Sequence, residues 1–130
     1  MAHPNEDVVR RGYQAFGEGD METLRSLFAA DAVHVATGNS PIAGDYEGID
    51  AILGYYGSLF ELSDGTFSAE LQSTRAEGDD TVVAVHRDRG QRAGKTLDQD
   101  ETLTFTLSDG KITRLVEEHS DPAAYDEFWS

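Results

Sequence analysis

Four titratable side chains of this chain could carry acid/base chemistry: His34, His86, His119 and Glu117. Glu117 and His119 stand two residues apart in a run that is typical of a β-strand, so they share one face of it. Imidazole titrates near neutral pH, and a neighbouring carboxylate orients the ring and favours its charged form. The residue types therefore predict a histidine general base, with Glu117 as its orienting group.

A metal site is the alternative use of the same side chains. Three histidines and one carboxylate are suitable ligands for zinc or iron. No two of them have the short spacing of a ligand motif, and the chain has no cysteine. We therefore expect no metal and no other cofactor.

Two charged runs are a further candidate for acid/base chemistry, because together they could form a carboxylate–arginine–carboxylate array. They are Arg87-Asp88-Arg89 and Asp98-Gln99-Asp100-Glu101. They lie near the ends of predicted strands, where alternating charge is typical of a solvated rim, and we expect that role for them. Asp121 precedes Pro122 at the end of the last predicted strand, where a turn or cap role is expected.

Helices are expected to hold some of these side chains in place. Apolar residues recur at helical spacing over residues 5–16. Asp20 is a suitable N-cap for a second helix, which would carry Phe28 on its apolar face. Turn residues are dense over residues 38–48, which predicts a loop, and a third helix is expected over residues 49–62.

The remainder of the chain predicts strands. Their ranges are 33–36, 66–75, 81–89, 96–107 and 112–119. The tail over residues 123–130 keeps Tyr125, Phe128 and Trp129, so we expect it to dock on the rest. The order α-α-β-α-β-β-β-β predicts an α+β domain, a cone-shaped, curved antiparallel sheet packed against three N-terminal helices. A curled sheet capped by helices encloses a space.

Composition limits the possible partners. With 130 residues there is room for one domain, expected over residues 1–130. The formal net charge of −15 argues against nucleic acid and anionic membranes as partners, because both attract basic surfaces. There is no apolar run of about 20 residues and no signal-peptide pattern at the start. Together with the absence of cysteine, this leads us to expect a cytoplasmic protein.

Several segments carry a resemblance to a known family. They are Arg10–Phe16 with Gly19-Asp20-Met21, Leu27–Val33, Tyr46-Glu47-Gly48, the Asp109–Ile112 hairpin, and Asp121 with Tyr125–Trp129. In this order of elements the chain resembles the nuclear-transport-factor-2-like superfamily, and within it the SnoaL-like, ketosteroid-isomerase-related proteins. That superfamily includes isomerases, polyketide cyclases, epoxide hydrolases, dehydratases and non-catalytic binding modules, so the resemblance implies the fold more firmly than the chemistry.

The catalytic pattern of the ketosteroid isomerases is missing. The resemblance places their general base at Ala36, their oxyanion-hole tyrosine at Gly12 and their protonated acid at Leu103. An enolising isomerase needs a base and oxyanion donors, and these side chains supply neither. We therefore expect no ketosteroid isomerisation, and only the helper tyrosine of the third helix remains, as Tyr56.

The resemblance also implies which side chains face the interior. It turns His34, His86, Glu117 and His119 toward one pocket, with Tyr56 above them. We predict His86 or His119 as the base, Glu117 as the orienting group, and Tyr56 and His34 as hydrogen-bond donors. The predicted substrate-binding positions are Tyr13, Ala36, Leu103, Leu115 and Trp129. A ligand-binding role implies a cavity of about 300 Å³ or more.

These expectations favour an acid/base enzyme of the isomerase, cyclase or hydratase/hydrolase type, acting on a small, mostly apolar organic substrate. The alternatives are a non-catalytic module that binds a small ligand and, third, a domain for protein partners. Members of the superfamily commonly dimerise through the outer face of the sheet. Alternating residues such as Thr102, Thr104 and Val85 would permit this, so a homodimer is expected.

Overall fold

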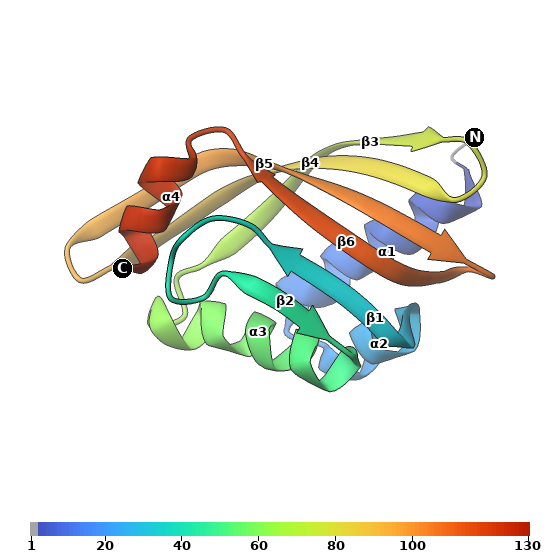
Figure 1. The fold of residues 1–130 in the computed structure, drawn as a ribbon, viewed down its shortest axis with the longest axis horizontal. Coiled ribbons are helices and arrows are strands. Elements are labelled where there is room, and N and C mark those ends of the chain that lie inside the picture. Colours follow the sequence, from blue (N-terminus) through green and yellow to red (C-terminus); the bar gives the residue numbers. More distant parts are fainter. Residues whose placement is uncertain (1–2) are drawn as a thin grey trace.

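Four helices and six strands make up residues 3–130, the part of the chain that the computed structural model describes (Figure 1). In chain order they are α1 (Pro4–Glu18), α2 (Met21–Leu27), β1 (Phe28–Ala36), β2 (Gly44–Glu47), α3 (Ile49–Leu62), β3 (Ser68–Glu77), β4 (Thr81–Arg92), β5 (Lys95–Ser108), β6 (Lys111–His119) and α4 (Pro122–Trp129).

The strands form one sheet in the order β2-β1-β6-β5-β4-β3. All neighbours are antiparallel except β1 and β6, which are parallel. The strands β4 and β5 have 12 and 14 residues, and long strands in a small sheet twist and curl. The predicted class, an α+β domain with a curved sheet under N-terminal helices, is confirmed, and the parallel pair is the one departure from an all-antiparallel sheet.

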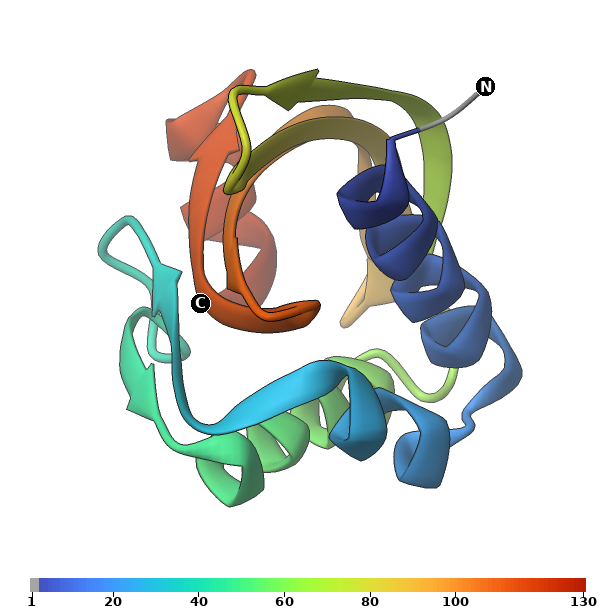
Figure 2. The same cartoon turned by 90° about the vertical axis from the view of Figure 1, so that its right-hand side faces the viewer.

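Helices close the open side of the curl. In Figure 2 the strands β3 to β6 trace an arc, with α1 and α3 on its open side. Helix α1 packs on β3 and β4, and α3 packs on β1 and β2. The buried residues of these helices, among them Val9, Ile52 and Leu59, therefore face the concave side of the sheet.

Two local predictions were wrong. Residues 44–47 lie in the predicted loop but form β2, which pairs with β1. This edge strand is mostly exposed and has no alternation of apolar residues to reveal it. Phe28 begins β1 instead of ending a helix, with φ −107° and ψ 148°. Phe28 is buried whether it ends the helix or begins the strand, so the apolar periodicity of the sequence does not tell the two conformations apart.

The tail docks as expected, and it does so as helix α4. Its residues Tyr125, Phe128 and Trp129 are buried. Asp121 is the N-cap, because its Oδ1 accepts a hydrogen bond from the Ala124 N–H at 3.1 Å, which confirms the expected cap role. Within residues 3–130, no helix combines the length and the apolar character that crossing a membrane requires.

The cap gives a first prediction. Asp121→Ala removes the acceptor for the Ala124 N–H and should lower the free energy of unfolding by about 1 kcal/mol in urea denaturation. Asp121→Asn keeps an acceptor oxygen and loses the same charge, so it should stay close to the wild type. Equal losses in both variants would show that the charge, not the hydrogen bond, is responsible.

Candidate functional site

The curled sheet and the helices α1 and α3 enclose a cavity of about 70 Å³. Most of its wall is apolar and much of it aromatic, including Phe16, Phe28, Leu59, Phe67, Leu103, Phe105 and Leu115. The volume is below the expected 300 Å³ or more, because aromatic rings occupy much of the interior. Phe16, for example, packs edge-on against Tyr56 and Phe67, with ring centroids 5.5 Å and 6.1 Å apart. The space therefore suits a molecule well below drug size.

A chain of three polar side chains borders this cavity, and we call it the Tyr56 relay: Tyr56, His34 and Glu117. Tyr56 Oη lies 2.9 Å from His34 Nδ1, and His34 Nε2 lies 2.6 Å from Glu117 Oε2. A carboxylate only accepts, so His34 carries its proton on Nε2 and accepts the Tyr56 hydroxyl proton at Nδ1. His34 and Glu117 are each only 2 % exposed. The relay is thus a buried hydroxyl–imidazole–carboxylate arrangement at the cavity wall.

Glu117 has further donors around it. Tyr55 donates to its Oε2 at 2.7 Å, and His119 Nε2 donates to its Oε1 at 3.0 Å. Burial alone would raise the pKa of Glu117, but the hydrogen bonds from His119 and His34 outweigh it and lower the pKa from 4.5 to about 2. Glu117 is therefore ionised at neutral pH, and it holds the imidazoles on both sides of it.

This low pKa predicts how stability depends on pH. The unfolded chain binds the Glu117 proton more tightly than the folded protein, since the pKa falls from 4.5 to about 2 on folding. The contribution of Glu117 is complete above pH 4.5 and is lost as the pH falls through about 2. Urea denaturation between these pH values should show a steeper loss of stability for the wild type than for Glu117→Gln. Parallel curves would contradict the ionised, hydrogen-bonded carboxylate.

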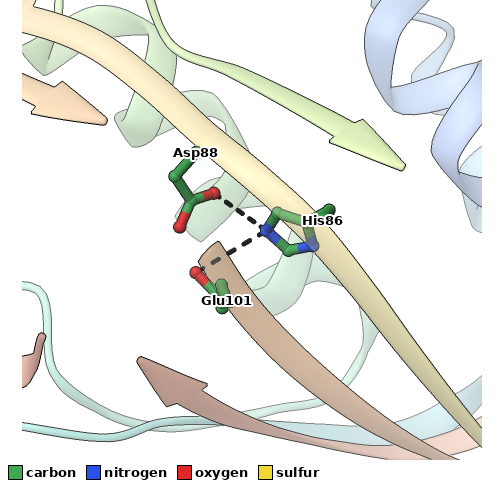
Figure 3. A group of neighbouring side chains, drawn as sticks. All are labelled: His86, Asp88 and Glu101. Carbon is green, nitrogen blue, oxygen red and sulfur yellow. Dashed lines mark hydrogen bonds and ion pairs between the residues drawn. The ribbon is translucent and has the colours of Figure 1, made fainter. Parts of the chain in front are cut away.

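A second group, which we call the acidic triad, consists of His86 and Asp88 on β4 and Glu101 on β5 (Figure 3). His86 Nε2 lies 2.8 Å from Asp88 Oδ1 and 3.7 Å from Glu101 Oε1. On its other side, His86 Nδ1 lies 2.6 Å from the Tyr13 hydroxyl. The triad residues are at most 4 % exposed, so two carboxyl groups are buried beside one imidazole.

The triad corrects the prediction of a solvated rim for the two charged runs. Both runs lie inside paired strands and not at a strand end, because β4 continues to Arg92 and β5 begins at Lys95. Alternation then turns Asp88 and Glu101 inward. Arg87 stays on the outer face and pairs with Asp98 at 2.8 Å and Asp100 at 3.1 Å. The rim interpretation holds for these three residues and for Arg89, which is exposed and pairs with Glu70 at 3.3 Å and Asp98 at 3.5 Å.

Glu101 connects the two groups. Its Oε1 lies 3.4 Å from Nδ1 of His119, the residue that donates to Glu117. Burial, and then the negative charges of Glu117 and Asp88, raise the pKa of Glu101 well above its ordinary value. Two glutamates on neighbouring strands thus have pKa values shifted in opposite directions.

The structure places most of the predicted catalytic side chains together. His34, Tyr56, His86 and Glu117 line the cavity. His119 is not among the lining residues. It lies behind Glu117 and stacks on Tyr125, with ring centroids 3.6 Å apart. His119 therefore has the geometry of a positioning residue and not that of a base in contact with a ligand.

The histidine partners observed for Glu117 differ in part from the predicted ones. Glu117 was expected beside His119 or His86, and its histidine partners are His119 and His34. The structure shows the His119 alternative, and the parallel contact of β1 with β6 brings His34 to Glu117 as a second histidine partner.

The predicted substrate-binding positions divide into two sets. Tyr13, Leu103 and Leu115 line the cavity. Ala36 and Trp129 do not. Ala36 pairs with Gly44 at the end of β1, and Trp129, the last residue of α4, packs against Phe67 and Phe128.

Sequence reasoning missed Tyr55, Glu101 and Tyr125, which also line the cavity. A usable signal existed for Glu101, because it shares the period-two face of β5 with Leu103 and Phe105.

The chain and its fold are similar to known proteins. The family model described as "SnoaL-like domain" matches residues 9–115. Rv0034 of Mycobacterium tuberculosis is 40% identical over 124 residues, which cover 95% of each chain. Bal32a, from a soil-derived mobile gene cassette, is 38% identical with a TM-score of 0.96, covering 98% of this chain and 97% of that chain. An NTF2-like protein from Burkholderia thailandensis, 22% identical, has a TM-score of 0.86 over 100% of this chain and 99% of that chain, a likeness of fold.

Proposed function

Because the chain belongs to the SnoaL-like domain family, we propose that it is an enzyme that performs acid/base chemistry on a small, mostly apolar organic molecule held in its cavity. The observation that carries the proposal is the Tyr56 relay, whose hydroxyl, imidazole and carboxylate are joined at 2.9 Å and 2.6 Å on the cavity wall. A fold alone would not support an activity, since this family's fold serves many functions.

The relay can move a proton without creating a buried charge on the tyrosine. Burial raises the pKa of Tyr56 well above its ordinary value, so a free tyrosinate is disfavoured. In the proposed step, Tyr56 Oη takes a proton from a substrate carbon while its own proton passes to His34 Nδ1. The electron pair of the broken C–H bond stays on the substrate as an enolate, whose oxygen would accept a hydrogen bond from a hydroxyl group of the cavity wall, for which Tyr13 is available. Glu117, ionised at neutral pH, stabilises the imidazolium that forms, as the carboxylate does in hydroxyl–histidine–carboxylate triads. The reverse transfer returns the proton as an acid.

This assignment moves the base from His86 or His119 to the Tyr56–His34 pair. His119 does not border the cavity, and both ring nitrogens of His86 are engaged, by Tyr13 and Asp88. The ring of His34 is held in the same way, and the Tyr13 hydroxyl beside His86 lines the cavity just as the Tyr56 hydroxyl does. The Tyr56 relay is distinguished by its carboxylate, because hydrogen bonds from His119 and His34 lower the pKa of Glu117 to about 2 and keep it ionised behind the imidazole. The proton therefore has a path from the ligand through the Tyr56 hydroxyl to the His34 imidazole, which the ionised Glu117 stabilises.

The wall favours an uncharged substrate. No lysine or arginine is among the lining residues in the described part of the chain, so an anionic group would have no cationic partner. Apolar and aromatic side chains supply most of the contact area. The class that fits is a small ketone or a related carbon acid, whose C–H proton the relay would remove.

Exchange of carbon-bound hydrogen tests the proposal without knowledge of the natural substrate. Acetone, cyclopentanone and cyclohexanone in D₂O lose their α-proton signals in ¹H NMR as deuterium enters. The wild type should accelerate this loss for a ketone that binds, and Tyr56→Phe should not. Binding of these ketones with no acceleration over the variant would favour the non-catalytic binding module instead.

A further inference from the structure

The acidic triad has the spacing of a metal site. Two ligands about 2.1 Å from a tetrahedral ion are about 3.4 Å apart. His86 Nε2 lies 2.8 Å from Asp88 Oδ1 and 3.7 Å from Glu101 Oε1, values on either side of that spacing. Figure 3 shows His86 directing this nitrogen toward both carboxyl groups. Small side-chain rotations would place all three atoms around one ion.

Buried polar atoms without partners provide a second, independent observation. Asp88 is 0 % exposed, and within residues 3–130 its Oδ2 has no hydrogen-bond partner. On the other side of Glu101, the buried His119 Nδ1 also lacks a hydrogen bond in the described chain, at 3.4 Å from Glu101 Oε1. Leaving a buried carboxylate oxygen such as Asp88 Oδ2 unpaired is costly, so a positive charge beside Asp88 would be stabilising.

The histidine of the triad already has the outer partner that metal-bound imidazoles have in proteins. When Nε2 of His86 binds an ion, Nδ1 carries the ring proton and donates it to the Tyr13 hydroxyl, 2.6 Å away. Such a contact fixes the ring orientation and the tautomer of a ligand. No lysine or arginine lies among the triad's hydrogen-bond or ion-pair partners in residues 3–130, so its two carboxyl groups have no cation of their own.

We propose that His86, Asp88 and Glu101 bind one divalent metal ion, and that zinc is the best fit. One imidazole and two carboxylates form a mixed nitrogen and oxygen set that zinc accepts. Two carboxylates balance the charge of the ion, which makes the buried site neutral. The sequence led us to expect no metal, and its metal alternative used three histidines and Glu117. The ligands proposed here share only His86 with that set, because Asp88 and Glu101 are expected at a solvated rim from the sequence alone.

An ion in the triad would border the cavity, since His86 and Glu101 line it. Three protein ligands leave a fourth position open, as in catalytic zinc sites. A ligand oxygen there would be polarised while the Tyr56 relay removes a proton. This consequence rests on the proposed function, whereas the binding of the ion does not.

Titration calorimetry with Zn²⁺ alone, on chelator-treated protein and without any organic ligand, tests the proposal. The wild type should bind one ion with a Kd of about 1 μM or below. Asp88→Asn and Glu101→Gln should each weaken binding about 100-fold or more, as loss of a direct ligand requires. The matched control Asp98→Asn removes the same charge from the outer face of β5 and should stay within about threefold of the wild type.

Two results would overturn the proposal. One is a wild type that binds no Zn²⁺ below about 100 μM. This is expected if Glu101 carries a proton and donates it as a hydrogen bond to one of the neighbouring acceptors, so that no ion is needed. The other is binding that Asp88→Asn and Glu101→Gln leave unchanged. If these variants do not fold, ¹⁵N NMR of the wild type decides, because Zn²⁺ should shift Nε2 of His86 and leave Nε2 of His34 in place. The rate of ketone exchange is measured separately, on chelator-treated protein. Zinc binding and ketone exchange can then fail independently, so the failure of the metal proposal is distinguished from the failure of the proposed function.

Discussion

Replacing Glu117 by alanine is expected to lower the free energy of unfolding by about 3–5 kcal/mol. The carboxylate accepts hydrogen bonds from His34, His119 and Tyr55, at 2.6, 3.0 and 2.7 Å. The substitution removes their shared acceptor inside a buried site, and unpaired buried donors are costly. Denaturation in urea at pH 7 measures the loss, provided that the variant folds, and the thermal midpoint reports it otherwise.

The neighbouring glutamate supplies the control. Glu118 is exposed on the same strand, so Glu118→Ala should change stability by less than about 0.5 kcal/mol. If the free energy of unfolding of Glu117→Ala is within about 1 kcal/mol of that of this control, Glu117 is not the shared acceptor that the structure shows.

His34→Gln should slow the exchange of a bound ketone by about 10²–10⁴-fold, the usual contribution of general acid/base catalysis. Glutamine keeps a polar side chain near Tyr56 and Glu117 but does not take up a proton at neutral pH. Affinity for the ketone should change little, because apolar side chains make most of the cavity wall. ¹H NMR in D₂O at saturating ketone measures the rate, and a titration measures the affinity.

Tyr46→Phe is the matched control for this prediction. It removes a hydroxyl that donates to the Ile42 carbonyl at 2.7 Å and does not belong to the cavity wall. Its exchange rate should equal that of the wild type within about threefold. A loss as large as that of His34→Gln would mean that general disturbance of the fold, and not proton transfer, explains both effects.

The fold could be predicted to a large extent, since long strands, hairpin turns and N-caps are local signals. Asp20 and Asp121 cap helices as expected, with side chains accepting from Thr23 and Ala124. The parallel pairing of β1 with β6 and the short strand β2 were not predictable in this way. The first depends on contacts about 80 residues apart, and the second has no buried face.

The candidate site was predicted in its residue types more than in its pairings. Period-two alternation correctly grouped Glu117 with His119, because that relation lies within one strand. The contact of His34 with Glu117 depends on which strands become neighbours, and no local pattern carries it. The small cavity volume also follows from how the rings of Phe16 and Tyr56 pack, which sequence spacing does not determine.

A second hollow offers a competing place for a ligand. It has a volume of about 380 Å³ and lies between the end of α3 and the β4–β5 hairpin, where Thr66, Lys95 and Thr96 border it. Its wall is polar, whereas the cavity wall is apolar and carries the relay.

Intermolecular NOEs from bound cyclopentanone distinguish the two places and test the central claim, that the cavity with the Tyr56 relay is the ligand site. We predict NOEs to the methyl groups of Leu103 and Leu115 and to the ring protons of Tyr56, which all line the cavity. NOEs confined to Thr66 and Thr96 would contradict the claim, because they would place the ligand in the open hollow, away from the relay.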